Sequence, residues 1–311
     1  MICSVSVDLD GLRSYAAIHG LSAEALPERT AQAVPVVAVA RLCELFASLR
    51  VSATFFAVGN ELEIPGSAAA LKAAASAGHE IGSHSHAHDY ALSRGELPQI
   101  ESDLARAEQA ISAAVGSVPR GFRAPGYTLS PALLEAVKAR GYLYDSSVLP
   151  SPPYYAAKAV VLAMYAMRGR RSHSILGGAG QWFGKRTPHW RDGVRELPIA
   201  TVPVLRAPVI GTSVLALRDR AAAAFTRAGH AGGHLNLELH GIDVLDASDA
   251  TPELAAAQPG LRLAASEKLR RLRALLETLT RSAETLTLER AALRLLPAPG
   301  IRAPRRPTHS G

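Results

Sequence analysis

Carboxylates and imidazoles gather at points of this sequence where short strand-like runs end. Asp8 and Asp10 close the opening run, and a spacing of two along a strand points both carboxylates the same way. The segment GSHSHAHD contributes His84 and His88, and a later run, LELH, ends at His240. One carboxylate with two imidazoles suits zinc or a similar borderline divalent metal and leaves positions open for water and substrate.

Such a site would support hydrolysis of an amide. A bound divalent ion lowers the pKa of its water toward ~7 and polarises a carbonyl group. The second carboxylate would take the proton of the attacking water, and His240 would protonate the leaving amine. Simpler explanations exist for each signal alone: Asp-x-Asp also marks nucleotide-sugar glycosyltransferases, HSHAH would suit a solvated loop, and His240 a buried structural histidine. Their order at successive strand ends favours the hydrolase.

The elements that would position these groups alternate between strand-like and helical runs. Strand-like runs are expected at 2–8, 51–58, 79–83, 121–124, 142–145, 195–202, 234–239 and 285–288. Helical patterns are expected at 31–50, 68–77, 96–115, 132–140, 213–227 and around 269–279, with Ser130 and Pro131 as N-cap and first residue of one helix. Repeated β–α alternation predicts an α/β fold with a parallel sheet, and about seven units favour a closed (β/α) barrel.

The segment 150–194 interrupts this alternation, so we expect an inserted lid over one face of the barrel. It contains both tryptophans, Trp182 and Trp190, with cations close by. This composition suits stacking against a sugar, although the tryptophans would equally hold a lid in place. We expect a single domain over residues 1–295, followed by a flexible basic tail at 296–311.

Within the insertion, the stretch 154–167 is apolar and is followed at once by Arg168, Arg170 and Arg171. It is too short to span a membrane. A core or lid helix would explain it, and so would an interfacial helix that meets a lipid-linked substrate at the membrane surface.

Composition bounds the class of protein. Of the 311 residues, 48% are hydrophobic and 20% charged, which is typical of a chain with a packed core. The net charge is +7, but only 5% of residues are aromatic, so a nucleic-acid partner is not expected. Cys3 and Cys43 are expected to be reduced thiols. No export signal is visible, so the expected compartment is the cytoplasm or the inner membrane face.

The same segments resemble the NodB-homology polysaccharide deacetylases, the fourth family of carbohydrate esterases. VDLDG, GHEIGSHSHAH, FRAPGY and LELH are similar to four of its motifs and follow in the same order, over about residues 2–245. The resemblance implies a distorted (β/α) barrel that hydrolyses an N-acetyl group with a divalent metal. Zinc is the expected ion, with Co²⁺, Fe²⁺ and Ni²⁺ as alternatives.

The resemblance also implies roles for individual residues. The general base would be Asp8, the metal ligands Asp10, His84 and His88, the residue that orients the base Arg123, and the general acid His240. Pro125 and Tyr127 would lie at the substrate, with Tyr127 near the place where a backbone N–H holds the oxyanion.

Two departures from the family pattern leave roles open. The family has adjacent aspartates, whereas Leu9 separates them here, so the division of labour between Asp8 and Asp10 is undecided. Asp145, in the loosely matching segment YDSS, would either support His240 or cap a turn.

The expected function is removal of an N-acetyl or N-formyl group from an amino sugar or glycan, carried on a nucleotide or a polyprenyl lipid. A C–N hydrolase of a non-sugar amide is an alternative within hydrolases. A non-catalytic protein that holds a metal and binds glycans is an alternative from another class.

Overall fold

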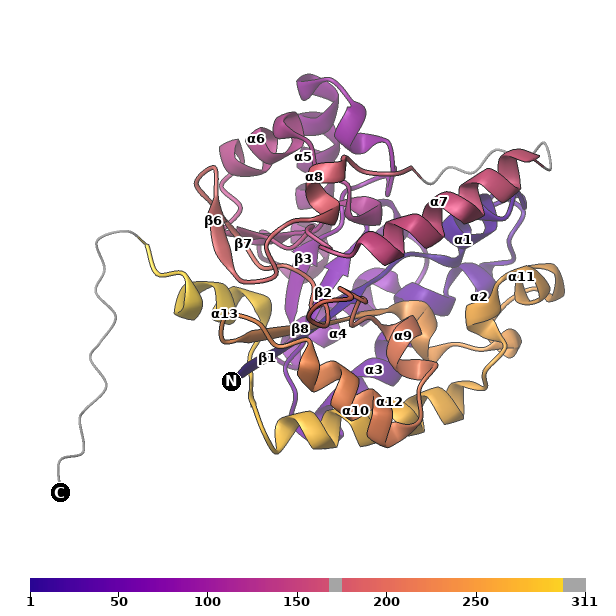
Figure 1. The fold of residues 1–311 in the computed structure, drawn as a ribbon. Coiled ribbons are helices and arrows are strands. Elements are labelled where there is room, and N and C mark those ends of the chain that lie inside the picture. Colours follow the sequence, from indigo (N-terminus) through magenta and orange to yellow (C-terminus); the bar gives the residue numbers. More distant parts are fainter. Residues whose placement is uncertain (168–174, 299–311) are drawn as a thin grey trace.

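The computed structural model describes residues 1–167 and 175–298. Their strands form one curled sheet of nine strands, in the order β6-β7-β5-β4-β3-β2-β1-β8, with β9 pairing with β1 (Figure 1). All pairings are parallel except the antiparallel pair β6 and β7. The strands are β1 (Ile2–Asp8), β2 (Thr54–Ala57), β3 (Glu80–Ser83), β4 (Gly121–Phe122), β5 (Tyr144–Asp145), β6 (His189–Arg191), β7 (Val194–Glu196), β8 (His234–His240) and β9 (Glu284–Thr285).

Helices surround the sheet and connect its strands. The α-helices are α1 (Leu12–Ile18), α2 (Glu28–Ala31), α3 (Val39–Leu49), α4 (Ser67–Ser76), α5 (Leu97–Val115), α6 (Pro131–Ala139), α7 (Pro152–Met167), α8 (Ala179–Trp182), α9 (Gly211–Leu215), α10 (Asp219–Ala228), α11 (Pro252–Ala257), α12 (Ala265–Thr280) and α13 (Leu288–Leu295). The short η turns are η1 (Ala33–Ala38), η2 (Asn60–Glu63), η3 (Leu92–Arg94), η4 (Pro125–Tyr127), η5 (Gly241–Val244), η6 (Ala247–Asp249) and η7 (Pro259–Leu261).

The sheet closes into a barrel only through irregular contacts. β7 and β8 are not neighbouring strands, but the chain after β7 reaches β8, where the Ala200 N–H donates to the Asn236 carbonyl at 3.0 Å. Ile210 then forms an isolated parallel bridge with Glu238. The result is the expected distorted (β/α) barrel, although its strand count departs from seven regular units.

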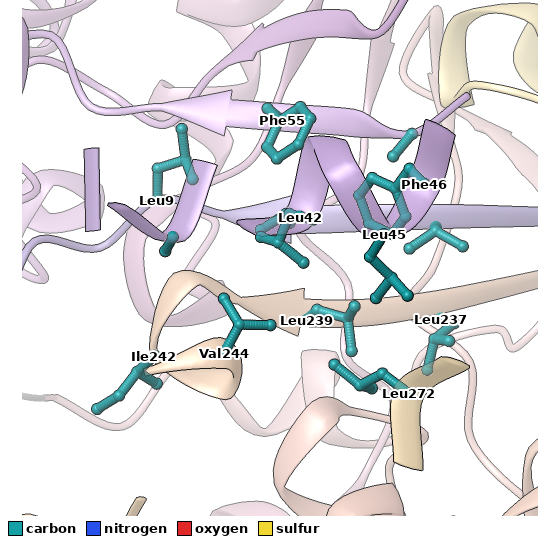
Figure 2. Close-up of a cluster of buried hydrophobic side chains, with 14 of the residues drawn as sticks. Leu9, Leu42, Leu45, Phe46, Phe55, Leu237, Leu239, Ile242, Val244 and Leu272 are labelled. Carbon is teal, nitrogen blue, oxygen red and sulfur yellow. The ribbon is translucent and has the colours of Figure 1, made fainter. Parts of the chain in front are cut away.

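The main core lies between the outer face of the barrel and its helices. Side chains of β1 point alternately to the two faces of the sheet. Cys3, Val5 and Val7 therefore join this apolar cluster, while the serines between them face the barrel interior. Figure 2 shows side chains of α3 beneath those of β2 and beside those of β8. The labelled members of this cluster are Leu9, Leu42, Leu45, Phe46, Phe55, Leu237, Leu239, Ile242, Val244 and Leu272.

Most elements were expected from the sequence, and the exceptions are short. Ser130 caps α6 by accepting the Leu133 N–H, with Pro131 as its first residue, as predicted. α1 and α13 were not expected, and the strand predicted at 285–288 is β9 followed directly by α13. α13 has few residues and a polar outer face, so its pattern is hard to separate from a turn.

The insertion folds as α7, α8 and the hairpin of β6 and β7, and α7 crosses the same side of the barrel as α1 (Figure 1). Arg168, Arg170 and Arg171 lie outside the described residues, as does 299–311 of the expected tail. Within 1–167 and 175–298, no helix has both the length and the apolar character needed to cross a membrane.

Candidate active site

The barrel brings the ends of β1 and β8 together at one rim. These strands run parallel in a register that pairs Asp8 with His240 and Ser6 with Glu238. Asp10 follows β1 by two residues, and all of these carboxylates are buried, Asp10 being 6% exposed. The strand-end groups named from the sequence therefore lie beside one another.

Asp10 and two histidines converge on one point. His84 Nε2 and His88 Nε2 each lie 3.1 Å from Asp10 Oδ1. The three atoms approach without forming an aligned hydrogen bond, and both Asp10 Oδ1 and His88 Nε2 are buried without a hydrogen-bond partner among the described residues. Converging lone pairs of this kind need a cation between them, and two imidazoles with a carboxylate suit a borderline divalent metal.

The loop after β3 explains why two of its three histidines turn to the same point. Ser85 and His88 adopt left-handed backbone conformations, with φ of 67° and 52°. The Ser85 hydroxyl accepts the His88 N–H at 3.0 Å, and Asp103 of α5 accepts the N–H groups of His86 and Ala87 at 2.9 and 3.0 Å. The His86 side chain instead packs against Gly59, buried and away from the ligand cluster.

The other ring nitrogen of each ligand histidine has a fixed partner. His84 Nδ1 donates to the Arg123 carbonyl at 2.8 Å, which leaves its Nε2 lone pair toward Asp10. His88 Nδ1 lies 3.2 Å from the Ser14 hydroxyl. Such contacts orient metal ligands and set their tautomers.

The carboxylates and imidazoles of this cluster shift one another's pKa values. Burial acts to raise the pKa of Asp10, but the neighbouring His88 and His84 outweigh it and hold that pKa well below its usual range. Burial acts to lower the pKa of His84, whereas Asp8 and Asp10 raise it on balance. The site therefore favours a positive charge beside Asp10, whether proton or metal.

Asp8 is held differently from Asp10. The fully buried Arg123 donates to Asp8 Oδ1 at 2.6 Å and is itself anchored on the Ser6 hydroxyl and on the Ser146 carbonyl and hydroxyl. Its guanidinium also lies 4.3 Å from the centre of the Phe56 ring. Asp8 Oδ2 has no hydrogen-bond partner among the described residues and lies 3.8 Å from His84 Nε2. One oxygen of Asp8 is thus fixed while the other faces the ligand cluster.

Glu238 is a site residue that the sequence analysis quoted but gave no role. Its Oε1 lies 2.9 Å from His240 Nδ1 and accepts the Tyr127 hydroxyl at 3.2 Å. His240 Nε2 faces the cluster, 3.3 Å from the Tyr127 hydroxyl and 3.8 Å from Asp10 Oδ2. The sequence could have indicated this pairing, because a spacing of two along a strand puts Glu238 and His240 on the same face of β8.

This arrangement keeps His240 charged. Burial acts to lower the pKa of His240, but the carboxylates of Glu238, Asp10 and Asp8 raise it well above its usual value. Asp8, Glu238 and His240 together could also hold a metal. One oxygen of each carboxylate is already engaged, Asp8 Oδ1 by Arg123 and Glu238 Oε1 by Tyr127, so we interpret this group as the acid–base part of the site.

The structure does not bring Asp145 to His240, which corrects one of the two roles considered for it. Asp145 accepts the Ser147 hydroxyl at 2.5 Å and interacts with Glu196 on the neighbouring strand β7. Ser147 in turn accepts the Ala124 N–H at 2.8 Å. Glu238 occupies the position beside His240 because it shares that strand, whereas β5 lies across the barrel.

The expected substrate residues are only partly at the site. Tyr127 reaches it through its hydroxyl, and its backbone N–H donates to the Ala124 carbonyl at 3.0 Å within η4. Pro125 is buried outside the pocket lining. Trp182 stacks on Tyr155 with ring centres 5.3 Å apart, as expected if this tryptophan holds the lid in place rather than stacking on a sugar.

Trp190 also lies outside the pocket lining. It sits on the edge strand β6, 37% exposed, with the Arg195 guanidinium 4.5 Å from its ring centre. Spacing in sequence could not separate these tryptophans from sugar-binding ones, because the path of the insertion decides where they point.

A pocket of about 470 Å³ opens above the cluster. Its floor includes Asp8, Asp10, His84 and His240, and its walls come from α1, α7, η4 and the segment 258–260. A pocket of this volume is large enough for a monosaccharide with part of its attached group.

A polysaccharide deacetylase family model matches residues 30–144. Both candidate ligand histidines and Arg123 fall inside the matched stretch, whereas the strand-end aspartates and His240 lie outside it. A peptidoglycan deacetylase from Helicobacter pylori is 26% identical over 159 residues, which are 50% of this chain and 53% of that protein. The chain therefore spans about half the length of this curated relative.

Solved structures share the fold over nearly the whole chain. A candidate polysaccharide deacetylase from Mycobacterium smegmatis is similar with a TM-score of 0.59 and 17% identity, covering 94% of this chain and 89% of that one. A family 4 acetyl xylan esterase from Clostridium thermocellum, in complex with a cobalt ion, gives a TM-score of 0.50 and 19% identity over 95% of this chain and 91% of that one.

Proposed function

We propose that the chain is a member of the polysaccharide deacetylase family and a metal-dependent hydrolase that removes an N-acetyl or N-formyl group from an amino sugar or glycan, which is supported by the matches described above. The substrate would be carried on a nucleotide or a lipid. We also propose that residues 1–295 act as one domain, with the insertion as the wall and lid of its pocket.

One observation carries the proposal: three candidate ligand atoms, from the segments that follow β1 and β3, converge with no aligned hydrogen bond among them. Asp10, His84 and His88 would hold the ion. When bound, a divalent cation there would polarise the amide carbonyl and lower the pKa of water. Zinc fits the donor set, and cobalt, iron and nickel are alternatives.

Asp8 would act as the general base. Its Oδ1 is fixed by Arg123, so its Oδ2 faces the ligand cluster with no other described partner. A carboxylate held in this way accepts the proton of an attacking water without having to reorient. This assigns the two aspartates separate tasks, with Asp10 as ligand and Asp8 as base.

His240 would act as the general acid. Glu238 holds its Nδ1, so Nε2 is the nitrogen that faces the site and the one that would give its proton to the leaving amine. The Tyr127 hydroxyl, 3.3 Å from Nε2, would help position this ring.

The test is release of acetate or formate from a panel of N-acylated amino sugars, by metal-stripped protein and after addition of Zn²⁺ or Co²⁺. We expect turnover only with metal. The rate of acetate or formate release should fall by about 10²-fold or more in His84→Ala and in Asp8→Asn. His86→Gln is the matched control, since His86 lies between the ligands in sequence but packs away from them.

Two outcomes would contradict the proposal. Turnover of cyclic ureides but of no acylated sugar would favour the non-sugar amide hydrolase. Sugar binding that survives in Asp8→Asn, with no turnover by the native chain under any metal, would favour the non-catalytic glycan-binding protein.

A further inference from the structure

The wall of the candidate active-site pocket contributed by α7 is apolar. Ala157, Val161 and Leu162 of this helix line the pocket, together with Ile18 of α1 and Ile242 of η5. Sugar rings present mainly hydroxyl groups, which such a wall would leave without hydrogen bonds. An attached hydrocarbon is a better match for this surface.

The apolar surface of α7 continues beyond the pocket. Val160, directly before the pocket-lining Val161, is 59% exposed, and Met164, two residues after the pocket-lining Leu162, is 38% exposed. Large apolar side chains grouped on a helix at the mouth of a pocket mark a binding surface rather than a packed one. A chain leaving the pocket along α7 would cover them.

Lys158 is the one charged residue of α7, and it lines the same pocket. Its ammonium lies 5.7 and 6.0 Å from the ring centres of Tyr90 and Tyr154, and no carboxylate of the described residues pairs with it. A Cβ at Gly126 would lie 3.4 Å from Lys158 Nζ, so the ammonium is beside the turn that carries Tyr127 into the site.

This lysine lacks compensation for its burial. Burial alone lowers its pKa to about 8, with no neighbouring carboxylate acting to restore it. A half-buried cation without an acidic partner gains most from an anionic ligand. A phosphate or carboxylate in the pocket would supply that partner.

We propose that the substrate is an N-acylated amino sugar with an anionic group that binds Lys158 and a hydrocarbon chain that lies along α7. This rests on the proposed function and narrows its substrate to an amphiphilic sugar. Lys158 is then a specificity-determining residue, and it takes no part in the proton transfers at Asp8 and His240. A nucleotide-linked sugar would supply the anion without the hydrocarbon.

The experiment compares five N-acetylglucosamine derivatives: the methyl glycoside, the decyl glycoside, the 1-phosphate, the decyl phosphodiester and the uridine diphosphate sugar. We expect the decyl phosphodiester to have the highest kcat/KM, about tenfold or more above the 1-phosphate and above the decyl glycoside. Equal kcat/KM for the methyl glycoside and the decyl phosphodiester would overturn the proposal, as would a preference for the uridine diphosphate sugar.

Variants separate the two contacts. Lys158→Met should raise KM for the phosphorylated substrates about ten- to a hundredfold while neutral substrates change less than about twofold, and Lys158→Arg should keep most of the native KM. Val161→Ser should reduce the advantage of the decyl chain alone. Lys72→Met, on the exposed face of α4, is the charge-matched control. Equal losses on charged and neutral substrates would show that Lys158 only supports the structure.

Binding keeps this inference separate from the proposed function. The Kd of the decyl phosphodiester is measured by calorimetry on Asp8→Asn and on the same variant with Lys158→Met. Weaker binding without Lys158 supports the inference even if no sugar is deacetylated, which would contradict only the proposed reaction. Equal Kd values overturn it, and thermal unfolding checks that each variant is folded.

Discussion

Histidines of this site differ in role through the partner of their second ring nitrogen. His84 Nδ1 donates to a neutral carbonyl, so its Nε2 offers a lone pair to a cation. His240 Nδ1 faces the Glu238 carboxylate, which favours the charged ring and makes Nε2 a proton donor. In the proposed mechanism, one side chain type therefore supplies both a ligand and an acid within a single pocket.

Replacing Glu238 should shift the pH dependence of the reaction. The carboxylate raises the pKa of His240, so the acid form persists above the usual histidine range in the native protein. In Glu238→Gln this support is lost, His240 loses its proton at lower pH, and the alkaline limb of the kcat/KM profile should move to lower pH. His240→Asn should lower kcat/KM by about 10²–10⁴-fold and abolish the alkaline limb of its pH profile. An unmoved limb in Glu238→Gln would exclude His240 as the acid.

The pair of Asp145 and Glu196 predicts a pH effect on stability. Burial raises the pKa of Glu196 well above its usual value, and the nearby Asp145 adds to this. The folded state then keeps a proton that the unfolded chain releases, so stability is full below the unfolded pKa and falls as pH rises toward the folded one. Glu196→Gln should not show this fall in stability with rising pH. In urea titrations, the free energy of unfolding of the variant minus that of the native chain should therefore increase between about pH 5 and 8. A pH-independent difference would contradict the raised pKa of Glu196.

Among the elements, the loop after β3 shows how a helix can orient candidate metal ligands without contributing one itself. Asp103 of α5 accepts two successive N–H groups of the loop, and Ser85 accepts a third. These bonds fix a backbone that twice enters the left-handed region, which costs of order 1–3 kcal/mol per residue. His84 and His88 face the same point only while this conformation is kept.

Asp103→Ala should therefore weaken metal binding although Asp103 is no ligand. We expect the metal affinity to fall about 10–100-fold, as for other residues that orient ligands. Competition with a fluorescent chelator measures the affinity directly. Glu101→Ala removes the same charge from the same helix without releasing the loop and should leave affinity within about twofold.

At the scale of the whole molecule, the candidate active site joins parts of the chain far apart in sequence. Asp8 ends β1 and Asp10 follows it, the histidines follow β3, and His240 with its partner Glu238 comes from β8, which lies next to β1. Barrel closure through Ala200 and Ile210 places β8 against the segment after β7. A metal bound by these groups would couple its binding to the folding of the barrel.

Metal removal should consequently lower thermal stability. With Zn²⁺ at about 100 times its Kd, the folded state gains about 2.7 kcal/mol, and we expect Tm to rise by roughly 5 °C over the chelator-treated protein. Differential scanning calorimetry measures the shift. The rise in Tm with Zn²⁺ should be absent in Asp10→Asn and kept in His86→Gln. If Asp10→Asn still shows the rise, the ion binds elsewhere.

The sequence alone determined the β–α alternation, the strand-end position of each reactive group and the likeness to the deacetylase family. These depend on local spacing: a period of two on β1 and β8 and helical periods on α3 and α12 are written in neighbouring residues. The pairing of Glu238 with His240 obeys the same rule and was open to prediction.

Tertiary structure decided which groups meet. Asp145 lies two residues before Ser147 and in a matching segment, yet pairing of β5 with β7 sets it beside Glu196 and away from His240. Trp182 and Trp190 carry the composition of a sugar site, but the path of the insertion stacks one on Tyr155 and leaves the other on an edge strand. Lys158 is the one charged residue of the apolar helix α7, and packing of α7 over the barrel places it in the pocket. Contacts between distant segments of this kind are not encoded in local spacing.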